Sequence, residues 1–286
     1  MLLLTGTIPV SGLSLAIGKI ELTEHGVIVD SQCLDINRGT ASMISAACTV
    51  CREYGLDNPV GMIAGDTGAG NGSAEIYDYL AENIHGMDVR VLTTHYIMPD
   101  IKRNKKVLEK IDSMKKRPVL IADAGGMYVA KAGGDGSRYD VFTPDLGELA
   151  FLADEEAVHP TYTRGFISHM EDDVPELISR AFKSKNIART LFVKGKVDYI
   201  CQDGEIIETI DQPNIEAMEP VGGTGDIVTG VISGLIYAGK SPVDACRIAG
   251  RVNRKAGELA RPTPATQVKE IIVCIPAALK EVLKQG

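Results

Sequence analysis

Short apolar runs alternate with longer stretches of helical periodicity along most of the chain. The runs that predict strands lie at 27–29, 60–64, 89–92, 119–122, 141–143 and 191–193. Helical patterns lie between them, at 40–53, 73–83, 100–113, 146–153 and 174–184. Several strand candidates are apolar at consecutive positions, which is typical of strands buried on both faces. The alternation predicts an α/β fold with a mainly parallel central sheet and helices on both faces.

The pattern changes after residue 195. Two β-rich segments, 197–200 and 206–210, flank Asp203-Gly204, a dipeptide that favours a tight hairpin turn. They predict a late antiparallel hairpin at an edge of the sheet. Helical patterns then return at 224–237, 242–259 and 267–283, where Pro276 is expected to break or kink the last helix.

No internal repeat or long linker interrupts the chain, so we interpret residues 1–286 as a single domain. The polar segment 154–171, which contains His159 and His169, is interpreted as a surface loop.

Composition excludes several classes of function. The net charge is −8 and the isoelectric point is about 5.2, which argues against a general nucleic-acid binder. The apolar amino-terminal segment has no basic residue before Lys19 and is interrupted by glycine and proline, unlike a signal peptide. No run of about 18 apolar residues predicts a membrane span. Six cysteines without metal-ligand spacing indicate a reduced, cytoplasmic protein.

The most informative segment is VGGTGDIVTGVISGLIYAGK, residues 221–240. Its glycine-rich turn leads into a helical pattern, and unpaired backbone N–H groups at a helix start suit an anion such as phosphate. Asp226 lies in the first helical turn. There it can stabilise the helix start, or it can take a proton from a hydroxyl that attacks a phosphorus atom. The segment fits neither a Walker A loop nor a dinucleotide fingerprint.

The GGTGD sequence at 222–226, about four-fifths along the chain, resembles the ribokinase-like superfamily. The closest branch is the carbohydrate-kinase-like family that includes ATP- or ADP-dependent NAD(P)H-hydrate dehydratase. TPDLGE at 143–148 is similar to that family's Thr-Pro, two residues, Gly-Glu element, and FVKG at 192–195 to one of its strand ends. Asp123 also ends a strand where the family usually has Asp-Ala. The resemblance spans roughly residue 36 to the end and implies a three-layer ribokinase-like sandwich.

The resemblance also implies roles for individual residues. Asp226 would be the catalytic base, and the turn before it would bind the transferred phosphoryl group through Gly222, Gly223, Thr224 and Gly225. Glu148 would organise Mg²⁺ through water. Lys194 and Pro264 would lie at the nucleotide, although Lys194 could equally be part of a structural ion pair.

Asn37 and Arg38 open the first long helical pattern, close to where sugar kinases place small residues near their substrate. Asn37 and Arg38 could therefore bind substrate hydroxyls or phosphate. An ordinary polar turn is the alternative interpretation.

Three further substrate contacts are predicted from positions that follow strands. The segment GDTGAGNGS at 65–73 has more glycines than a helix start needs, and Asp66 and Asn71 are its candidate polar contacts. His95 follows the next strand candidate. Ligands of open α/β sheets bind outside the carboxyl ends of the strands, so these side chains are expected at the substrate.

These residues predict an enzyme that transfers a phosphoryl group from ATP or ADP to a small-molecule hydroxyl with Mg²⁺. The first alternative is the hydrate dehydratase. Its usual Thr-Pro-His-Pro-Gly-Glu element differs here, because Asp145 and Leu146 replace His and Pro. The second alternative is a non-catalytic nucleotide-binding protein. The phosphoryl acceptor, the choice between ATP and ADP and the formation of a homo-oligomer stay open.

Overall fold

The computed structural model describes residues 1–24, 26–157 and 174–285. Its strands are β1 (Leu2–Ile8), β2 (Ala16–Leu22), β3 (Val27–Val29), β4 (Gln32–Leu34), β5 (Val60–Gly65), β6 (Val91–His95), β7 (Val119–Ala122), β8 (Val141–Phe142), β9 (Thr190–Val193), β10 (Asp198–Gln202) and β11 (Glu205–Ile210). Its α-helices are α1 (Thr40–Glu53), α2 (Asn71–Asn83), α3 (Ile101–Asp112), α4 (Gly125–Gly133), α5 (Leu146–Ala153), α6 (Val174–Lys183), α7 (Thr224–Tyr237), α8 (Pro242–Ala260) and α9 (Val268–Gln285).

The described strands form an 11-stranded sheet in the order β11-β10-β9-β8-β7-β6-β1-β5-β2-β3-β4. The strands from β9 to β5 in this order are parallel to one another. Antiparallel strands extend both edges, with β10 and β11 at one edge and β2 to β4 at the other. The mainly parallel sheet and the late hairpin are therefore confirmed.

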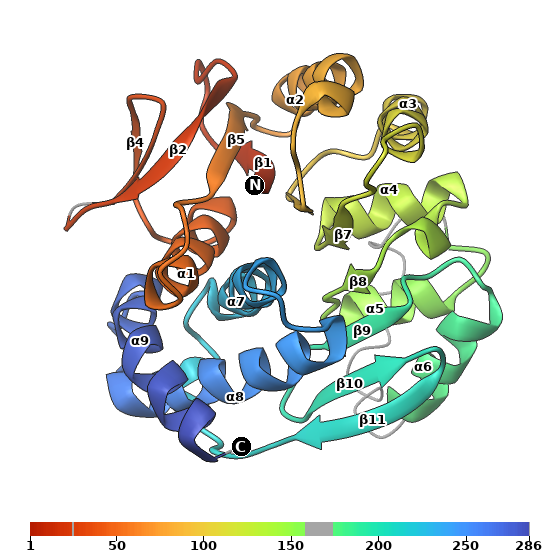
Figure 1. Cartoon of the computed structure of the whole chain (residues 1–286). Helices are drawn as coiled ribbons and strands as arrows, with labels where there is room; N and C mark the ends of the chain where they lie inside the picture. Colours follow the sequence, from red (N-terminus) through yellow and green to blue (C-terminus); the bar gives the residue numbers. More distant parts are fainter. Residues whose placement is uncertain (25, 158–173, 286) are drawn as a thin grey trace.

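Helices cover both faces of the sheet. Helices α1, α7, α8 and α9 pack on one face, and the curved sheet wraps around α7 in Figure 1. Helices α2 to α6 pack on the other face. Strand β1 contributes side chains to the hydrophobic cores on both faces of the sheet, with Leu2 and Leu4 in one core and Leu3 in the other. This alternation follows from the two-residue period of a strand.

Helices α1 and α7 pack against each other through two glycines of α7. A Cβ atom at Gly230 would lie 2.2 Å from the Met43 carbonyl oxygen, and one at Gly234 would lie 2.8 Å from the Val50 Cβ atom. The missing side chains let the two backbones approach closely. The close contact also brings the amino-terminal ends of α1 and α7 together, since the Gly39 N–H group donates to the Asp226 carboxylate.

We predict that Gly230→Ala lowers the free energy of unfolding by about 2 kcal/mol, because the new methyl group meets backbone that cannot rotate away. The better helix propensity of alanine offsets only about 1 kcal/mol of the clash. Thermal unfolding should detect a decrease in Tm of roughly 4–8 °C. Gly86→Ala is the control, because nothing lies within 4 Å of the added Cβ atom there. Equal Tm values for the two variants would contradict the packing account.

Several expectations need correction. Strand β6 runs to His95, so His95 ends the strand rather than following it. Of the two expected effects of Pro276, a break or a kink, the break does not occur, because helix α9 continues through this residue. Strands β1, β2 and β4 and helix α4 were not expected. Most of the segment 154–171, with His159 and His169, lies outside the described residues. Among the helices that are described, none combines the length and the apolar character of a membrane span.

Candidate active site

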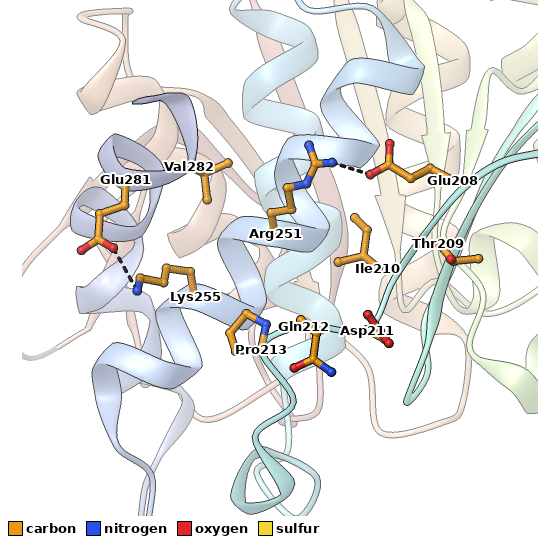
Figure 2. A pocket seen from close by; sticks show the side chains of 10 residues that line it. All are labelled: Glu208, Thr209, Ile210, Asp211, Gln212, Pro213, Arg251, Lys255, Glu281 and Val282. Atoms are coloured by element: carbon orange, nitrogen blue, oxygen red, sulfur yellow. Dashed lines mark hydrogen bonds and ion pairs between the residues drawn. The ribbon is translucent and has the colours of Figure 1, made fainter. Parts of the chain in front are cut away.

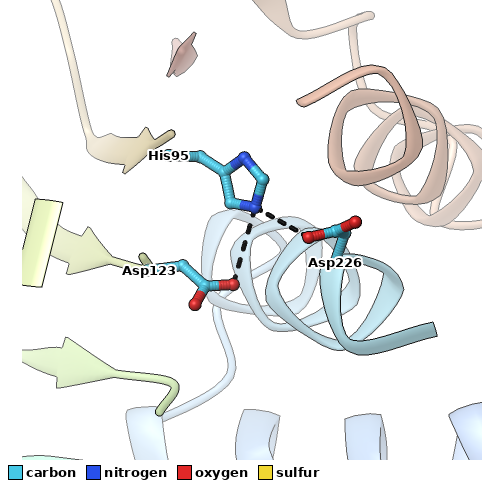
Figure 3. A group of neighbouring side chains, drawn as sticks. All are labelled: His95, Asp123 and Asp226. Atoms are coloured by element: carbon cyan, nitrogen blue, oxygen red, sulfur yellow. Dashed lines mark hydrogen bonds and ion pairs between the residues drawn. The ribbon is translucent and has the colours of Figure 1, made fainter. Parts of the chain in front are cut away.

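Asp226 lies at the junction of α7, α1 and β6. The residue is 9% exposed, and both oxygens of its carboxylate have partners. Oδ1 lies 3.0 Å from His95 Nε2, as Figure 3 shows, and Oδ2 accepts a hydrogen bond of 2.6 Å from the Gly39 N–H group. Gly39 precedes α1 with φ 69°, a conformation that glycine adopts without strain. Two helix amino termini therefore converge on this one carboxylate.

The environment keeps Asp226 ionised. Burial alone raises its pKa, but the His95 hydrogen bond and charge, the Lys194 ammonium and the Gly39 N–H group together lower the pKa below its usual value. A carboxylate in this state can accept a proton from a hydroxyl group at neutral pH.

Asp123 follows β7 and is 1% exposed. Its carboxylate accepts hydrogen bonds of 2.9 and 3.2 Å from Lys194 Nζ and one of 2.6 Å from the Thr229 hydroxyl group. His95 Nε2 lies 3.6 Å from Asp123 Oδ2. Asp123 thus links the end of β9 to α7 and to the end of β6.

Lys194 and Glu148 form the other side of this charged group. The two side chains are 15% and 12% exposed, and Lys194 Nζ lies 4.0 Å from Glu148 Oε2. Burial lowers the pKa of Lys194, but Asp123 and Glu148 outweigh it and raise the pKa overall. Burial raises the pKa of Glu148 to about 7, although Lys194 acts in the opposite direction.

Local hydrogen bonds hold Glu148 in place. The Tyr128 hydroxyl group donates to Glu148 Oε1 at 2.8 Å. Glu148 and Asp145 form a reciprocal capping box at the start of α5, in which each backbone N–H group donates to the other side chain. Asp145, which replaces the family's usual residue, therefore has a clear role in starting the helix that presents Glu148.

The GGTG turn leads directly into α7. Gly223 caps the helix with φ 101°, and no side chain accepts a hydrogen bond from the backbone at this cap. A Cβ atom at Gly225 would lie 3.3 Å from the Lys194 Cδ atom, and one at Gly223 would lie 3.1 Å from the Arg38 Cα atom. The first backbone N–H groups of α7 thus lie between Lys194 and Arg38, a setting that suits a phosphate group.

The two predicted nucleotide contacts, Lys194 and Pro264, differ in how close to this turn the structure puts them. Lys194 contacts it directly, as described above. Pro264 is exposed in the turn between α8 and α9, four residues before Val268, which packs against Gly223.

The structure shows what two of the predicted substrate contacts touch within the protein. His95 has no exposed surface and contacts Asp226 instead of an open substrate site. Asp66 is 9% exposed, and its carboxylate accepts hydrogen bonds from Gly68, Gly70 and Ser73. These bonds shape the 65–73 loop from within. Asn37 and Asn71 are exposed and stay candidate substrate contacts.

The bonds to Asp66 predict a pH-dependent effect on stability. Burial raises the pKa of this carboxyl, but the loop's hydrogen bonds outweigh it and lower the pKa. The stabilisation is therefore present above about pH 4 and is lost as the pH falls through the folded-state pKa. Asp66→Asn should lower the free energy of unfolding by about 2 kcal/mol at pH 7. Below about pH 4, urea unfolding should show a smaller difference in free energy of unfolding between this variant and the unmodified protein.

Asp57→Asn, at an exposed loop position, is the control for this change. If Asp66→Asn left stability unchanged but abolished turnover, Asp66 would be a substrate contact after all.

Sequence reasoning named His95 and Lys194 but missed three other residues that hold this group of side chains in place. Gly39, Thr40 and Thr229 carry no motif of their own, and each reaches the site through a contact distant in sequence. Asp123 was noticed only as a strand end. Its buried position among His95 and Lys194 depends on the pairing of the strands.

A separate hollow of about 250 Å³ lies between α8, α9 and the end of β11 (Figure 2). Four of the charged side chains that line it form ion pairs, with Arg251 2.5 Å from Glu208 and Lys255 2.9 Å from Glu281. None of the predicted site residues lines it. We therefore place the candidate chemistry at Asp226.

Comparison with known proteins identifies the family. The profile of the carbohydrate-kinase-like family described as NAD(P)H-hydrate dehydratase matches residues 98–276. The chain belongs to this family. It is a family of enzymes with the ribokinase-like fold, as the sequence predicted.

Individual relatives agree with this result. The chain is 45% identical over 234 residues to an uncharacterised protein from Methanocaldococcus jannaschii, covering 81% of this chain and 96% of that protein. It is 24% identical over 264 residues to an ADP-dependent (S)-NAD(P)H-hydrate dehydratase from Haloterrigena turkmenica, covering 86% and 95%. It spans less than half the length of the bifunctional NAD(P)H-hydrate repair enzymes that it matches.

The fold is similar to that of an ADP/ATP-dependent NAD(P)H-hydrate dehydratase from Bacillus subtilis that was co-crystallised with ATP and Mg²⁺. The TM-score is 0.56 at 16% identity, and the match covers 84% of each chain. Family membership favours the dehydratase alternative over the sugar-kinase-like phosphoryl transfer that the sequence analysis put first.

Proposed function

We propose that this chain is a nucleotide-dependent NAD(P)H-hydrate dehydratase, a hydro-lyase that restores a reduced nicotinamide from its hydrate. The observation that carries the proposal is the ionised Asp226 beside the GGTG turn at the start of α7, where no side chain forms a cap hydrogen bond. A base next to an anion site is the arrangement that activation of a hydroxyl by phosphate requires.

In the proposed reaction, the hydroxyl oxygen of the hydrate forms a bond to the terminal phosphorus of the nucleotide, and Asp226 accepts the proton of that hydroxyl group. The bond from that phosphorus to the nucleotide's bridging oxygen breaks. Phosphate then leaves with the former hydroxyl oxygen and the electron pair of the broken C–O bond. The adjacent ring carbon loses a proton to water, and the electron pair of that C–H bond forms the double bond of the reduced nicotinamide. The backbone N–H groups of Gly223, Thr224 and Gly225 face the charge that develops on the transferred group.

Mg²⁺ fits this site through Glu148. Each oxygen of Glu148 accepts one hydrogen bond, from Tyr128 or from the Asp145 backbone, and retains a lone pair for a metal-bound water. Mg²⁺ prefers oxygen ligands and keeps several waters, so a contact through water suits it. When bound, the ion neutralises charge on the nucleotide phosphates. Lys194 and Arg38 are proposed to flank the same phosphates.

The test is to incubate the protein with Mg²⁺, ADP or ATP and the hydrates of NADH and NADPH. We expect the absorbance of reduced nicotinamide to return only when nucleotide is present. A parallel panel of sugars and vitamins measures nucleotide consumption alone. Turnover with a member of that panel and none with the hydrates would overturn the dehydratase in favour of the kinase interpretation. Nucleotide binding without any turnover would favour a non-catalytic protein.

A further inference from the structure

His95 is fully buried at the end of β6, and both of its ring nitrogens lie near polar groups. Figure 3 shows the two carboxylates beside Nε2. Nε2 lies 3.0 Å from Asp226 Oδ1 and 3.6 Å from Asp123 Oδ2. Nδ1 lies 3.2 Å from the Thr40 hydroxyl oxygen. The ring therefore connects α1, α7 and the end of β7.

Hydrogen-bond accounting determines which nitrogens carry protons. The Thr40 hydroxyl group donates its single proton to the Thr7 carbonyl oxygen at 2.8 Å. Thr40 can therefore only accept from His95, and Nδ1 must be the donor. On the other side of the ring, an ionised Asp226 carboxylate can only accept, so Nε2 must also be a donor. A ring that donates from both nitrogens is an imidazolium cation.

We propose that His95 is a positioning residue that acts as a buried cation between Asp226 and Asp123. It fixes the orientation of the Asp226 carboxylate together with the Gly39 N–H group, and it keeps that carboxylate ionised. The catalytic consequence rests on the proposed function, because it requires Asp226 to be the base. The protonated state of the ring stands on the contacts alone.

The charges around the ring support this role. Asp226 and Asp123 are negative, and Lys194 is paired with Asp123 at 2.9 Å. Glu148 lies beyond Lys194, and the exposed Tyr96 ring packs edge-on against His95. A neutral His95 would leave the two aspartates with one cation, beside a site for negatively charged phosphates. A cationic His95 balances them.

A metal ion is the competing occupant of the same place. One ligand atom each from His95, Asp123 and Asp226 lie within 4.8 Å of one another, the only such group among the described residues. However, Lys194 and Thr229 already donate to the Asp123 carboxylate. A metal would also have to replace the proton on Nε2. The imidazolium satisfies these contacts with no further group.

The first test observes the ring protons directly. In protein with ¹⁵N-labelled histidine at neutral pH, we expect His95 to show an N–H proton on both Nδ1 and Nε2. The His95→Gln spectrum assigns the signals by their loss, and elemental analysis measures bound metal in the purified protein. A single ring N–H proton, or a stoichiometric metal that is lost in His95→Gln, would overturn the proposal.

The second test separates charge from hydrogen bonding. His95→Gln can still donate toward Asp226 but lacks the charge, whereas His95→Asn is too short to reach it. We expect kcat to fall about 10–100-fold in His95→Asn, the range seen when outer partners of metal ligands are removed. The loss of kcat should be smaller in His95→Gln. In that variant the acidic side of the kcat–pH profile should move to higher pH, because the pKa of Asp226 rises when a neighbouring cation is lost.

His85→Gln is the matched control, since His85 is exposed in a short 3₁₀ helix, Ile84–Gly86. Lower stability of the His95 variants with an unchanged kcat pH profile would mean that His95 is structural only, which overturns the positioning role. If the unmodified protein does not convert hydrates, the dehydratase proposal fails, whereas the ring protons still decide the state of His95.

Discussion

Asp226→Asn is expected to reduce kcat about 10²–10⁴-fold, the usual contribution of a general base. The amide cannot accept a proton, but it has nearly the shape of the carboxylate and still fits at the start of α7. Nucleotide affinity should be retained or slightly increased, because a negative charge beside the phosphates is lost. Measuring kcat, nucleotide Kd and Tm on the same preparation separates these effects.

Asp244→Asn is the matched control for this variant, because Asp244 also lies in the first turn of a helix, α8, but is exposed. It should leave kcat unchanged. In Asp226→Asn, one of the two carboxylate oxygens becomes an NH₂ group, so either His95 or Gly39 loses its hydrogen-bond acceptor. A stability cost of up to about 2 kcal/mol is therefore compatible with a catalytic role. Near-normal turnover in Asp226→Asn would mean that the carboxylate only stabilises its helix.

Lys194→Met is expected to lower the free energy of unfolding by about 3–5 kcal/mol. Removing one partner of a buried ion pair is costly, and Asp123, only 1% exposed, would keep only the His95 ring that it shares with Asp226. Methionine fills a similar volume, so the loss reports charge more than packing. Thermal and denaturant unfolding with and without nucleotide measure the change.

Two variants identify the cause of that loss. Lys255→Met removes a lysine from a half-buried surface pair with Glu281 and should cost no more than about 1 kcal/mol. The double variant Asp123→Asn, Lys194→Met should recover part of the stability, because the buried Asp123 charge is removed together with its partner, whereas Glu148 still lacks Lys194. A stable Lys194→Met single variant that has lost only nucleotide binding would assign Lys194 to the nucleotide and not to a structural pair.

The sequence predicted those parts of the fold that local pattern determines. Helices α1, α5 and α7 begin and end where periodicity and start signals placed them, at residues 40–53, 146–153 and 224–237. The central strand β1, all seven residues of which are buried, was missed because the apolar amino-terminal segment was considered only as a signal peptide or a membrane span. Helix α4 begins with two glycines, which are poor helix formers, but Gly125 fits closely against the Ile97 carbonyl oxygen.

In the candidate site, too, the sequence predicted the features that lie close together in the chain and missed the contacts between distant residues. Asp226 and the glycine turn were predictable because they are consecutive in sequence. The His95 contact joins residues 131 positions apart, so no spacing reveals it. The glycine-rich loop at 65–73 was interpreted as a substrate contact, but its glycines turn backbone N–H groups inward toward Asp66. A carboxylate that binds substrate and one that binds its own loop have the same local sequence pattern.

The central claim is tested most directly by the stoichiometry of a single reaction. Purified protein, Mg²⁺, a limiting amount of the NADH hydrate and an excess of ADP or ATP are combined, and reduced nicotinamide and free phosphate are measured together. The account predicts one phosphate released for each reduced nicotinamide formed, with neither product above background in Asp226→Asn. Phosphate release without any reduced nicotinamide, or reduced nicotinamide formed without nucleotide, would contradict it.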